Sequence, residues 1–269
     1  MPRLVGITAL VILIAVVVAP FLFTANAALK TSKQWVQNPV GLAFPPSVAN
    51  FESVWNRLGM PAPFINSLLV TIVSVILLWA VSLPAAFAVS KLRFPGRIAV
   101  LFVVFGSIMI PIQSILDPLF ILAFHLGFVN QFYGLIFTLS AFGVAETVFL
   151  LAAFMKAIPN ELIEAAQIDG ASTLALLRHV IAPLAKPALA TTGIINFVWI
   201  WNNLLLTVIL IESPSRETLT VAVGLIPGEY GVGVPILAAA ALIGAAPLVV
   251  VFLLGQRYVV RGVMQGAFR

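Results

Sequence analysis

The sequence predicts an all-α membrane protein with six transmembrane helices, and three observations lead to this prediction. Hydrophobic residues make up 62% of the 269 residues and charged residues only 9%, whereas a soluble domain carries about 25% charge. The mean hydropathy is +1.15. The apolar runs are about 20 residues long and apolar on all sides, which fits membrane helices and not the shorter, alternating strands of a barrel.

The apolar runs divide one transmembrane domain, residues 1–269, into six spans. We expect them at about residues 4–24, 64–89, 98–120, 132–155, 188–211 and 234–258. The third span is interrupted by Pro111 and Pro118, which a membrane helix tolerates where neighbours re-satisfy its backbone. The first run has an alternative reading as a secretory signal cleaved after residues 25–27 (ANA), although about 20 residues is long for a signal core of 7–15.

The basic residues predict the topology, because Lys and Arg concentrate in cytoplasmic loops. The proposed inner group is Arg3, Lys91, Arg93, Arg97, Lys156, Arg178, Lys186, Arg257, Arg261 and Arg269. The outer group is Lys30, Lys33, Arg57 and Arg216. Both termini are therefore expected in the cytoplasm. The net charge of +5 belongs to these loops and does not indicate nucleic-acid binding.

A polar segment, residues 156–187, separates the fourth and fifth spans and should lie at the cytoplasmic surface. Pro159 and Asn160 mark a helix start, with Asn160 as the expected N-cap. Gly170 supplies a break, and Ser172 or Thr173 can cap a second helix. Helical spacing places on one face Leu162, Ala165, Ala166 and Asp169. The segment is either an interaction surface or an interfacial connector between two spans.

Two short stretches in this segment resemble a known signature. The stretch "EAAQIDGAS" (residues 164–172), followed by "VIAP" (residues 180–183), resembles the EAA signature of permease subunits in binding-protein-dependent importers of the ATP-binding-cassette (ABC) superfamily. That signature is Glu-Ala-Ala, three residues, Gly, nine residues, Ile-x-Leu-Pro. Val180 replaces its isoleucine and Ala182 its leucine, and both remain apolar.

Stretches elsewhere extend the resemblance to nearly the whole chain. "INSLLVTIVSV", "VSKLRFPGR", "FVWIWNNLLL", "ETLTVAVGLI" and the tail "QRYVVRGVMQGAFR" are similar to carbohydrate permeases of the maltose-transporter second-subunit kind. Two features depart from that family. Its tail more often ends in Val-Lys-Gly, and Asn203 is often replaced by an acid. The resemblance thus implies an importer of a sugar or oligosaccharide, and these differences weaken any transfer of the particular substrate.

The resemblance implies a type I ABC importer permease fold in a bacterial or archaeal cytoplasmic membrane, with residues 156–187 as the segment that couples to an ATPase. The implied coupling residues are Glu161, Glu164, Ala165, Ala166, Asp169, Gly170, Ala171 and Pro183. A second ATPase contact is implied at Gln256, Arg257 and Gly266. The implied partners are a second permease chain, two ATPase subunits that carry ATP and Mg²⁺, and an extracytoplasmic solute-binding protein.

The energy source distinguishes the importer from its rivals. A phosphate-binding loop needs a Gly-Lys pair, and the sequence contains none, so ATP hydrolysis would belong to a partner. An ion-driven transporter usually carries intramembrane acids, and Glu146 lies near the middle of the fourth span. Glu146 is therefore a candidate for the translocation path, or else a hydrogen-bonded structural residue. We expect no catalytic residue and no metal site. The sequence has only two histidines and no cysteine, and its carboxylates are not spaced for acid–base catalysis.

A carbohydrate path would use amides and aromatic rings, because sugars combine hydroxyl edges with apolar faces. The fifth span offers Asn196, Trp199 and Asn203 on one helical face, and the third offers Gln113. The alternative roles are an interfacial aromatic belt for tryptophan and interhelical hydrogen bonds for asparagine.

Overall fold

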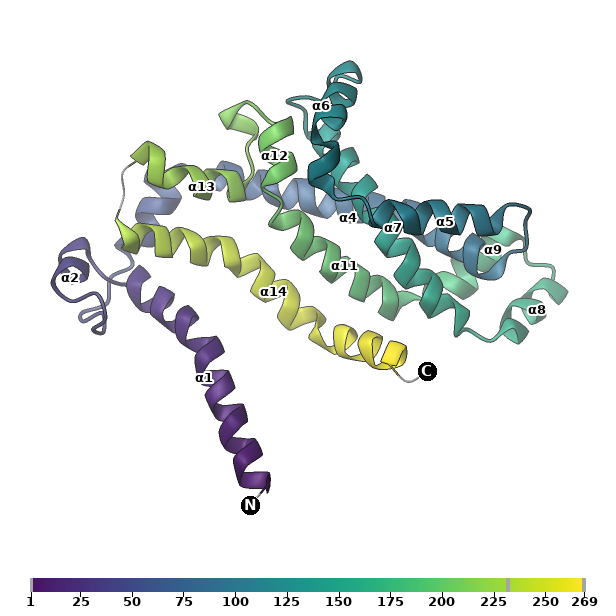
Figure 1. The fold of residues 1–269 in the computed structure, drawn as a ribbon, viewed down its shortest axis with the longest axis horizontal. Coiled ribbons are helices and arrows are strands. Elements are labelled where there is room, and N and C mark those ends of the chain that lie inside the picture. Colours follow the sequence, from purple (N-terminus) through teal and green to yellow (C-terminus); the bar gives the residue numbers. More distant parts are fainter. Residues whose placement is uncertain (1, 231–232, 268–269) are drawn as a thin grey trace. The chain divides into compact units, whose positions relative to one another are not determined.

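The computed structural model describes residues 2–230 and 233–267, and its regular elements there are all helical (Figure 1). The longest hydrophobic runs form the long helices, three of which continue through an internal proline: Pro20, Pro84 and Pro247. The α-helices are α1 (Pro2–Ala28), α2 (Ser32–Gln37), α3 (Ala49–Glu52), α4 (Pro61–Lys91), α5 (Arg97–Ile108), α6 (Leu116–His125), α7 (Phe132–Lys156), α8 (Asn160–Ile168), α9 (Thr173–Leu176), α10 (Ala182–Leu184), α11 (Lys186–Trp201), α12 (Leu205–Leu210), α13 (Leu219–Tyr230) and α14 (Val234–Ala267).

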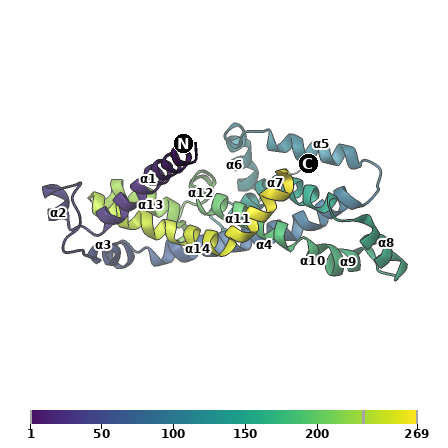
Figure 2. The ribbon, with the colours of Figure 1, turned by 90° about the horizontal axis from the view of Figure 1, so that it is seen from below.

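The helices fall into two compact units. The first unit contains Met1–Ile65 and Thr218–Pro247, and the second contains Asn66–Glu217 and Leu248–Arg269. The second unit holds the polar segment between α7 and α11. Figure 2 shows α8, α9 and α10 following one another within it.

Three helices of the second unit, α4, α7 and α11, pack closely because small residues face large ones. A Cβ on Gly143 of α7 would lie 2.2 Å from Leu78 Cδ1, and one on Gly193 of α11 would lie 2.3 Å from the Trp79 ring. Small residues allow membrane helices to approach in this way. A hydrophobic cluster joins the ends of α4 and α7 to the polar segment; its buried residues include Val89, Met155, Ile158, Ile163 and Leu176.

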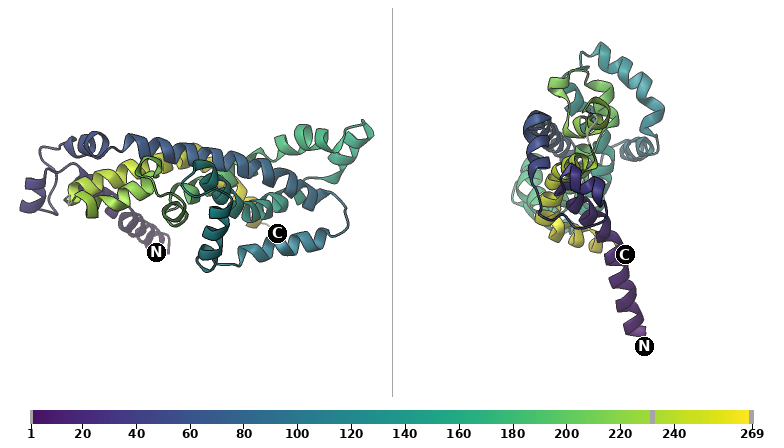
Figure 3. Two further views of the ribbon diagram at one scale, coloured as in Figure 1. Left: turned by 90° about the horizontal axis from the view of Figure 1, so that it is seen from above. Right: turned by 90° about the vertical axis from the view of Figure 1, so that its left-hand side faces the viewer.

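Four helices are long and apolar enough to cross a membrane, and up to six spans result if each of two bent pairs counts as one. The third predicted span is one of these pairs. It turns by 98° between α5 and residues 112–125, and Figure 3 shows this corner. Pro111 at the corner has no N–H and holds an extended backbone (ψ 130°), so the chain turns at one of the two prolines that the sequence singled out as interruptions.

The fifth predicted span is also interrupted. Helix α11 begins at Lys186 and ends at Trp201, and α12 begins only at Leu205. The side chain of Asn202 bonds back to the carbonyl of Val198 (2.8 Å), while Asn203 accepts a bond from the backbone of α12. Such local side-chain bonds compete with helix continuation, so residues 188–211 are two helices and not one.

Candidate functional site

The candidate site is the polar segment between α7 and α11, and a left-handed glycine shapes it. Helix α8 ends at Ile168, and Gly170 adopts φ +84°. The N–H of Ala171 donates to the carbonyl of Ala166 (2.9 Å) and closes the turn. Ser172 then caps α9 by accepting a bond from Ala175 N (3.3 Å), as the sequence predicted.

The segment has a buried side and an exposed side. Ile163 is buried in the cluster with α4 and α7, and Ala166 and Ala171 pack partly against it. The exposed side carries two large apolar residues, Ile168 (86% exposed) and Leu174 (73% exposed). Also exposed there are the predicted coupling residues Glu161, Glu164, Ala165, Asp169, Gly170 and Pro183. An acidic surface with protruding apolar side chains, held rigidly from behind, is suited to docking a protein.

Lys91, at the end of α4, holds the start of this segment in place. Its ammonium donates to the carbonyl of Ile158 (2.6 Å) and to Asn160 Oδ1 (2.8 Å). The expected N-cap role of Asn160 is therefore wrong: the N-cap position is Pro159, and Asn160 begins the helix with its side chain bonded to Lys91. From the sequence, Lys91 was assigned only to the basic residues that predict topology. No motif or spacing in the sequence links residues 91 and 160.

The predicted path residues do not form one continuous face. Asn196 is buried and donates to Thr147 Oγ1 of α7 (2.9 Å) and to Thr192 O (2.8 Å). Trp199 is exposed, and Asn203 lies beyond the end of α11. The helical spacing that grouped these three fails because the helix stops at Trp201. Asn196 thus makes the interhelical hydrogen bond that the sequence left open as its alternative role.

The remaining predicted residues are distributed over other helices. Glu146 is exposed on α7, and Gln113 is exposed in the turn between α5 and α6. Gln256 and Arg257 are exposed on α14, and the side chain of Gln256 bonds to Leu253 O in its own helix (3.1 Å). Gly266 belongs to α14, but its surroundings lie outside the described residues.

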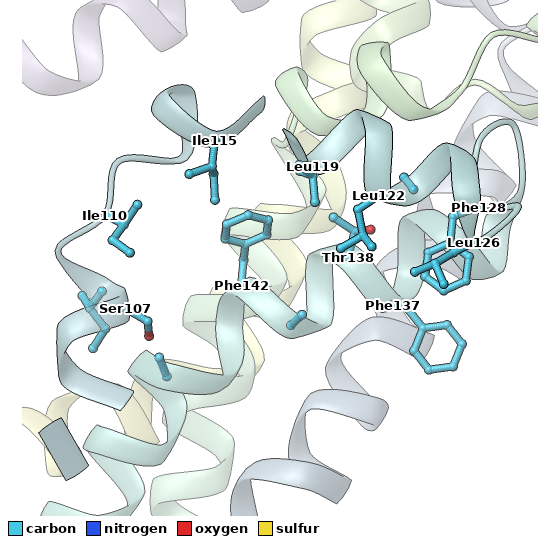
Figure 4. A pocket seen from close by; sticks show the side chains of 14 residues that line it. Ser107, Ile110, Ile115, Leu119, Leu122, Leu126, Phe128, Phe137, Thr138 and Phe142 are labelled. Atoms are coloured by element: carbon cyan, nitrogen blue, oxygen red, sulfur yellow. The ribbon is translucent and has the colours of Figure 1, made fainter. Parts of the chain in front are cut away.

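A cavity of about 510 Å³ opens between α7 and the bent pair α5 and α6 (Figure 4). Its lining is mostly aliphatic and aromatic, with Phe142 facing into it. Two hydroxyl groups line it, and both already donate within their own helices: Ser107 to Val104 O and Thr138 to Gly134 O, each at 2.8 Å. A polyhydroxylated solute needs many free donors and acceptors, so this cavity is unsuited to it.

Comparison with known proteins identifies the chain. Residues 15–265 match the family described as the binding-protein-dependent transport system inner membrane component. The chain belongs to this family. It is a transporter subunit of the ABC importer class, in which the ATPase is a separate subunit. The resemblance found in the sequence is thus confirmed at the level of the family.

Individual family members match over nearly their full length. The chain is 32% identical to the melibiose/raffinose/stachyose import permease protein MelC of Bacillus subtilis, over 97% of this chain and 96% of that one. It is 28% identical to the trehalose/maltose transport system permease protein MalG of Thermococcus litoralis, covering 99% and 97% of the two chains. A bacterial ABC transporter involved in alginate import has the same fold, with a TM-score of 0.86, 22% identity and 95% coverage of both chains. The all-α importer permease fold is therefore confirmed.

Proposed function

We propose that this permease forms half of the translocation path of an ATP-driven importer for a sugar or oligosaccharide. Two relatives that match over nearly their whole length carry sugar names, melibiose/raffinose/stachyose and trehalose/maltose. The transporter with the same fold imports a polysaccharide. All of these substrates share glycosidic linkages and polyhydroxylated rings, which is the chemical class we assign to the solute.

The observation that carries the coupling role is the two-sided segment around α8. Its buried side is fixed to α4 and α7, and its exposed side presents Glu161, Glu164, Ile168 and the turn at Gly170. A surface of this kind transmits movement only if a partner holds it. The partner is an ATPase subunit that binds ATP and Mg²⁺, and residues 256, 257 and 266 at the tail form a second contact with it.

A second permease chain supplies the other half of the path, and a solute-binding protein delivers the sugar from outside. Both termini and the segment around α8 lie in the cytoplasm. ATP binding brings the two ATPase subunits together, and the segment around α8 moves with them. The translocation path then opens to the outside. ATP hydrolysis returns the path to its inward-facing state. The two states differ in free energy because the ATPases contact the permeases differently in each. Glu146, Trp199 and Gln113 are exposed and available to the path, whereas Asn196 already has its partners.

Co-purification from native membranes tests this proposal. The tagged chain, extracted in mild detergent, should elute with an ATPase, a second six-span permease and a binding protein, identified by mass spectrometry. The binding protein is then screened with raffinose, melibiose, maltose and trehalose. Reconstituted vesicles should accumulate the sugar that binds most tightly, and only with ATP. A chain that elutes alone, with uptake that follows the proton gradient and ignores ATP, would overturn the proposal and direct attention to Glu146.

A further inference from the structure

The loop that follows α1 presents an apolar surface outward. Five apolar side chains in residues 36–48, here called the apolar loop, are almost fully exposed: Val36 (79%), Val40 (82%), Leu42 (88%), Phe44 (85%) and Val48 (69%). The sequence contains no charged residue between Lys33 and Glu52. Contiguous exposed apolar side chains of this kind mark an interaction surface or a membrane contact.

Polar side chains on the inner side of the loop satisfy its backbone. Lys30 is fully buried, and its ammonium donates to the carbonyls of Asn38 (2.8 Å) and Pro39 (2.7 Å). Gln34 Nε2 donates to the carbonyls of Phe44 (2.9 Å) and Pro45 (3.1 Å). Three polar side chains at the base of the loop are therefore used for backbone bonds, while the large apolar side chains are exposed.

Asn26 sets the depth of the loop. This residue lies in the last turn of α1, and its side chain donates to Gly41 O (2.8 Å) and accepts from Ala43 N (2.8 Å). The 27 residues of α1 span roughly 40 Å at 1.5 Å per residue, which exceeds the ~30 Å hydrocarbon core but not the headgroup layers. The two bonds hold Gly41 and Ala43 beside the last turn of α1, so Leu42 would lie near the bilayer interface when α1 spans the membrane.

The chemistry at this depth favours lipid over a protein partner. Lipid tails offer no hydrogen bonds, so bonded backbone groups lower the cost of approaching hydrocarbon. The bonds from Asn26, Lys30 and Gln34 satisfy the carbonyls of residues 38, 39, 41, 44 and 45 and the N–H of Ala43. Trp35 packs edge-on against Phe23 of α1 (ring centroids 6.0 Å apart), and tryptophan is enriched at the membrane interface. Lys33 adds an exposed positive charge next to the apolar residues, which suits anionic headgroups.

We propose that the apolar loop is a membrane anchor that lies in the bilayer interface at the end of α1, with Val40, Leu42 and Phe44 inserted below the headgroups. The loop thus extends the lipid contact of α1 sideways and holds this unit at a fixed depth. The inference does not depend on the transported solute or on which side of the membrane the loop lies.

Single cysteines test the anchor directly, because the natural sequence has none. Leu42→Cys and Phe44→Cys would carry a fluorescent label in the complete complex in nanodiscs. Asn56→Cys, an exposed polar position of the same unit, is the matched control. We expect brominated lipid to quench the labels at 42 and 44 more strongly than aqueous iodide, and iodide to quench more strongly at 56.

Two results would overturn the anchor. Stronger quenching by iodide at 42 and 44 would show that the loop faces water. Labels that neither quencher reaches until the binding protein or second permease is removed would show that a protein covers the loop. Failure of the sugar-uptake assay would not affect any of these outcomes, so the two proposals are tested separately.

Discussion

At the scale of single residues, Lys91 shows how a charge that sets topology also makes specific contacts. The Ile158 carbonyl lies between α7 and α8, and the Lys91 ammonium binds it together with the side chain of Asn160. Hydrophobic contact between these helices is non-directional, whereas these two hydrogen bonds fix the position of α8 relative to the end of α4.

The Lys91→Met variant should therefore uncouple the ATPase from transport. We expect uptake to fall roughly tenfold, within the usual 5–150-fold range of coupling between sites, while ATP hydrolysis continues. Arg93→Met is the matched control, because it removes one positive charge from the same loop at an exposed position. Equal ratios of sugar imported per ATP hydrolysed in the two variants would contradict the role of Lys91.

Gly170 is a second position at which a single substitution tests the proposed contact with the ATPase. Its φ of +84° favours glycine, yet a Cβ there would meet nothing within 4 Å of its own chain. Aspartate and asparagine both tolerate this backbone region better than other residues. We expect Gly170→Asp to abolish uptake while membrane insertion stays normal, because its side chain meets only the docked ATPase.

Comparison of Gly170→Asp with Gly170→Asn separates charge from bulk. Loss of uptake in both variants would indicate a steric requirement at the turn, and loss in the aspartate variant alone an electrostatic one. Uptake and co-elution of the ATPase are measured side by side. Normal transport by Gly170→Asp would rule out the coupling assignment.

At the scale of elements, the break between α11 and α12 has an identifiable cause. Asn203 Oδ1 accepts a bond from Leu206 N (3.0 Å) and so satisfies a free N–H in the first turn of α12. A carboxylate at this position would accept the same N–H. Asn203 is thus a helix-capping residue in addition to its predicted place in the path.

Replacing Asn203 by alanine should cost about 0.5–2 kcal/mol of stability, the usual effect of losing a helix cap. Asn203→Asp should retain nearly all of it, since a carboxylate also accepts the N–H. Thermal unfolding of the purified complex in detergent measures both variants. If aspartate destabilised the complex as much as alanine, the hydrogen bond would not be the cause.

At the scale of the whole molecule, the distribution of charge predicts the orientation in the membrane. Ten of the 14 Lys and Arg residues fall in the proposed inner segments, and this bias sets topology. Gln167→Cys on α8 and Ser215→Cys after α12 are exposed positions on opposite predicted sides. A membrane-impermeant maleimide added to intact cells should label position 215 only, and both positions after permeabilisation. The reverse pattern would invert the topology.

The sequence was most informative where the signal is local or compositional. Mean hydropathy predicted a membrane protein, and the Glu-Ala-Ala-x₃-Gly pattern predicted the family and the turn at Gly170. The sequence was less informative about where the helices end. Pro111 was visible, but the 98° turn follows from packing that the sequence does not show, with α5 against α7 and α6 against α12. Asn196 could equally have faced a path or a neighbouring helix, and only packing against Thr147 distinguishes these.

The sequence by itself thus determined the helical membrane class, the family and the position of the polar segment between α7 and α11, because hydrophobicity and short motifs act within about 20 neighbouring residues. The tertiary structure alone decided which polar side chains hold distant segments together. Lys91 reaches Asn160, and Asn26 reaches Ala43, across 69 and 17 residues. These contacts form only when the apolar helices have packed. A buried polar group must then form a hydrogen bond with a residue that the fold places next to it.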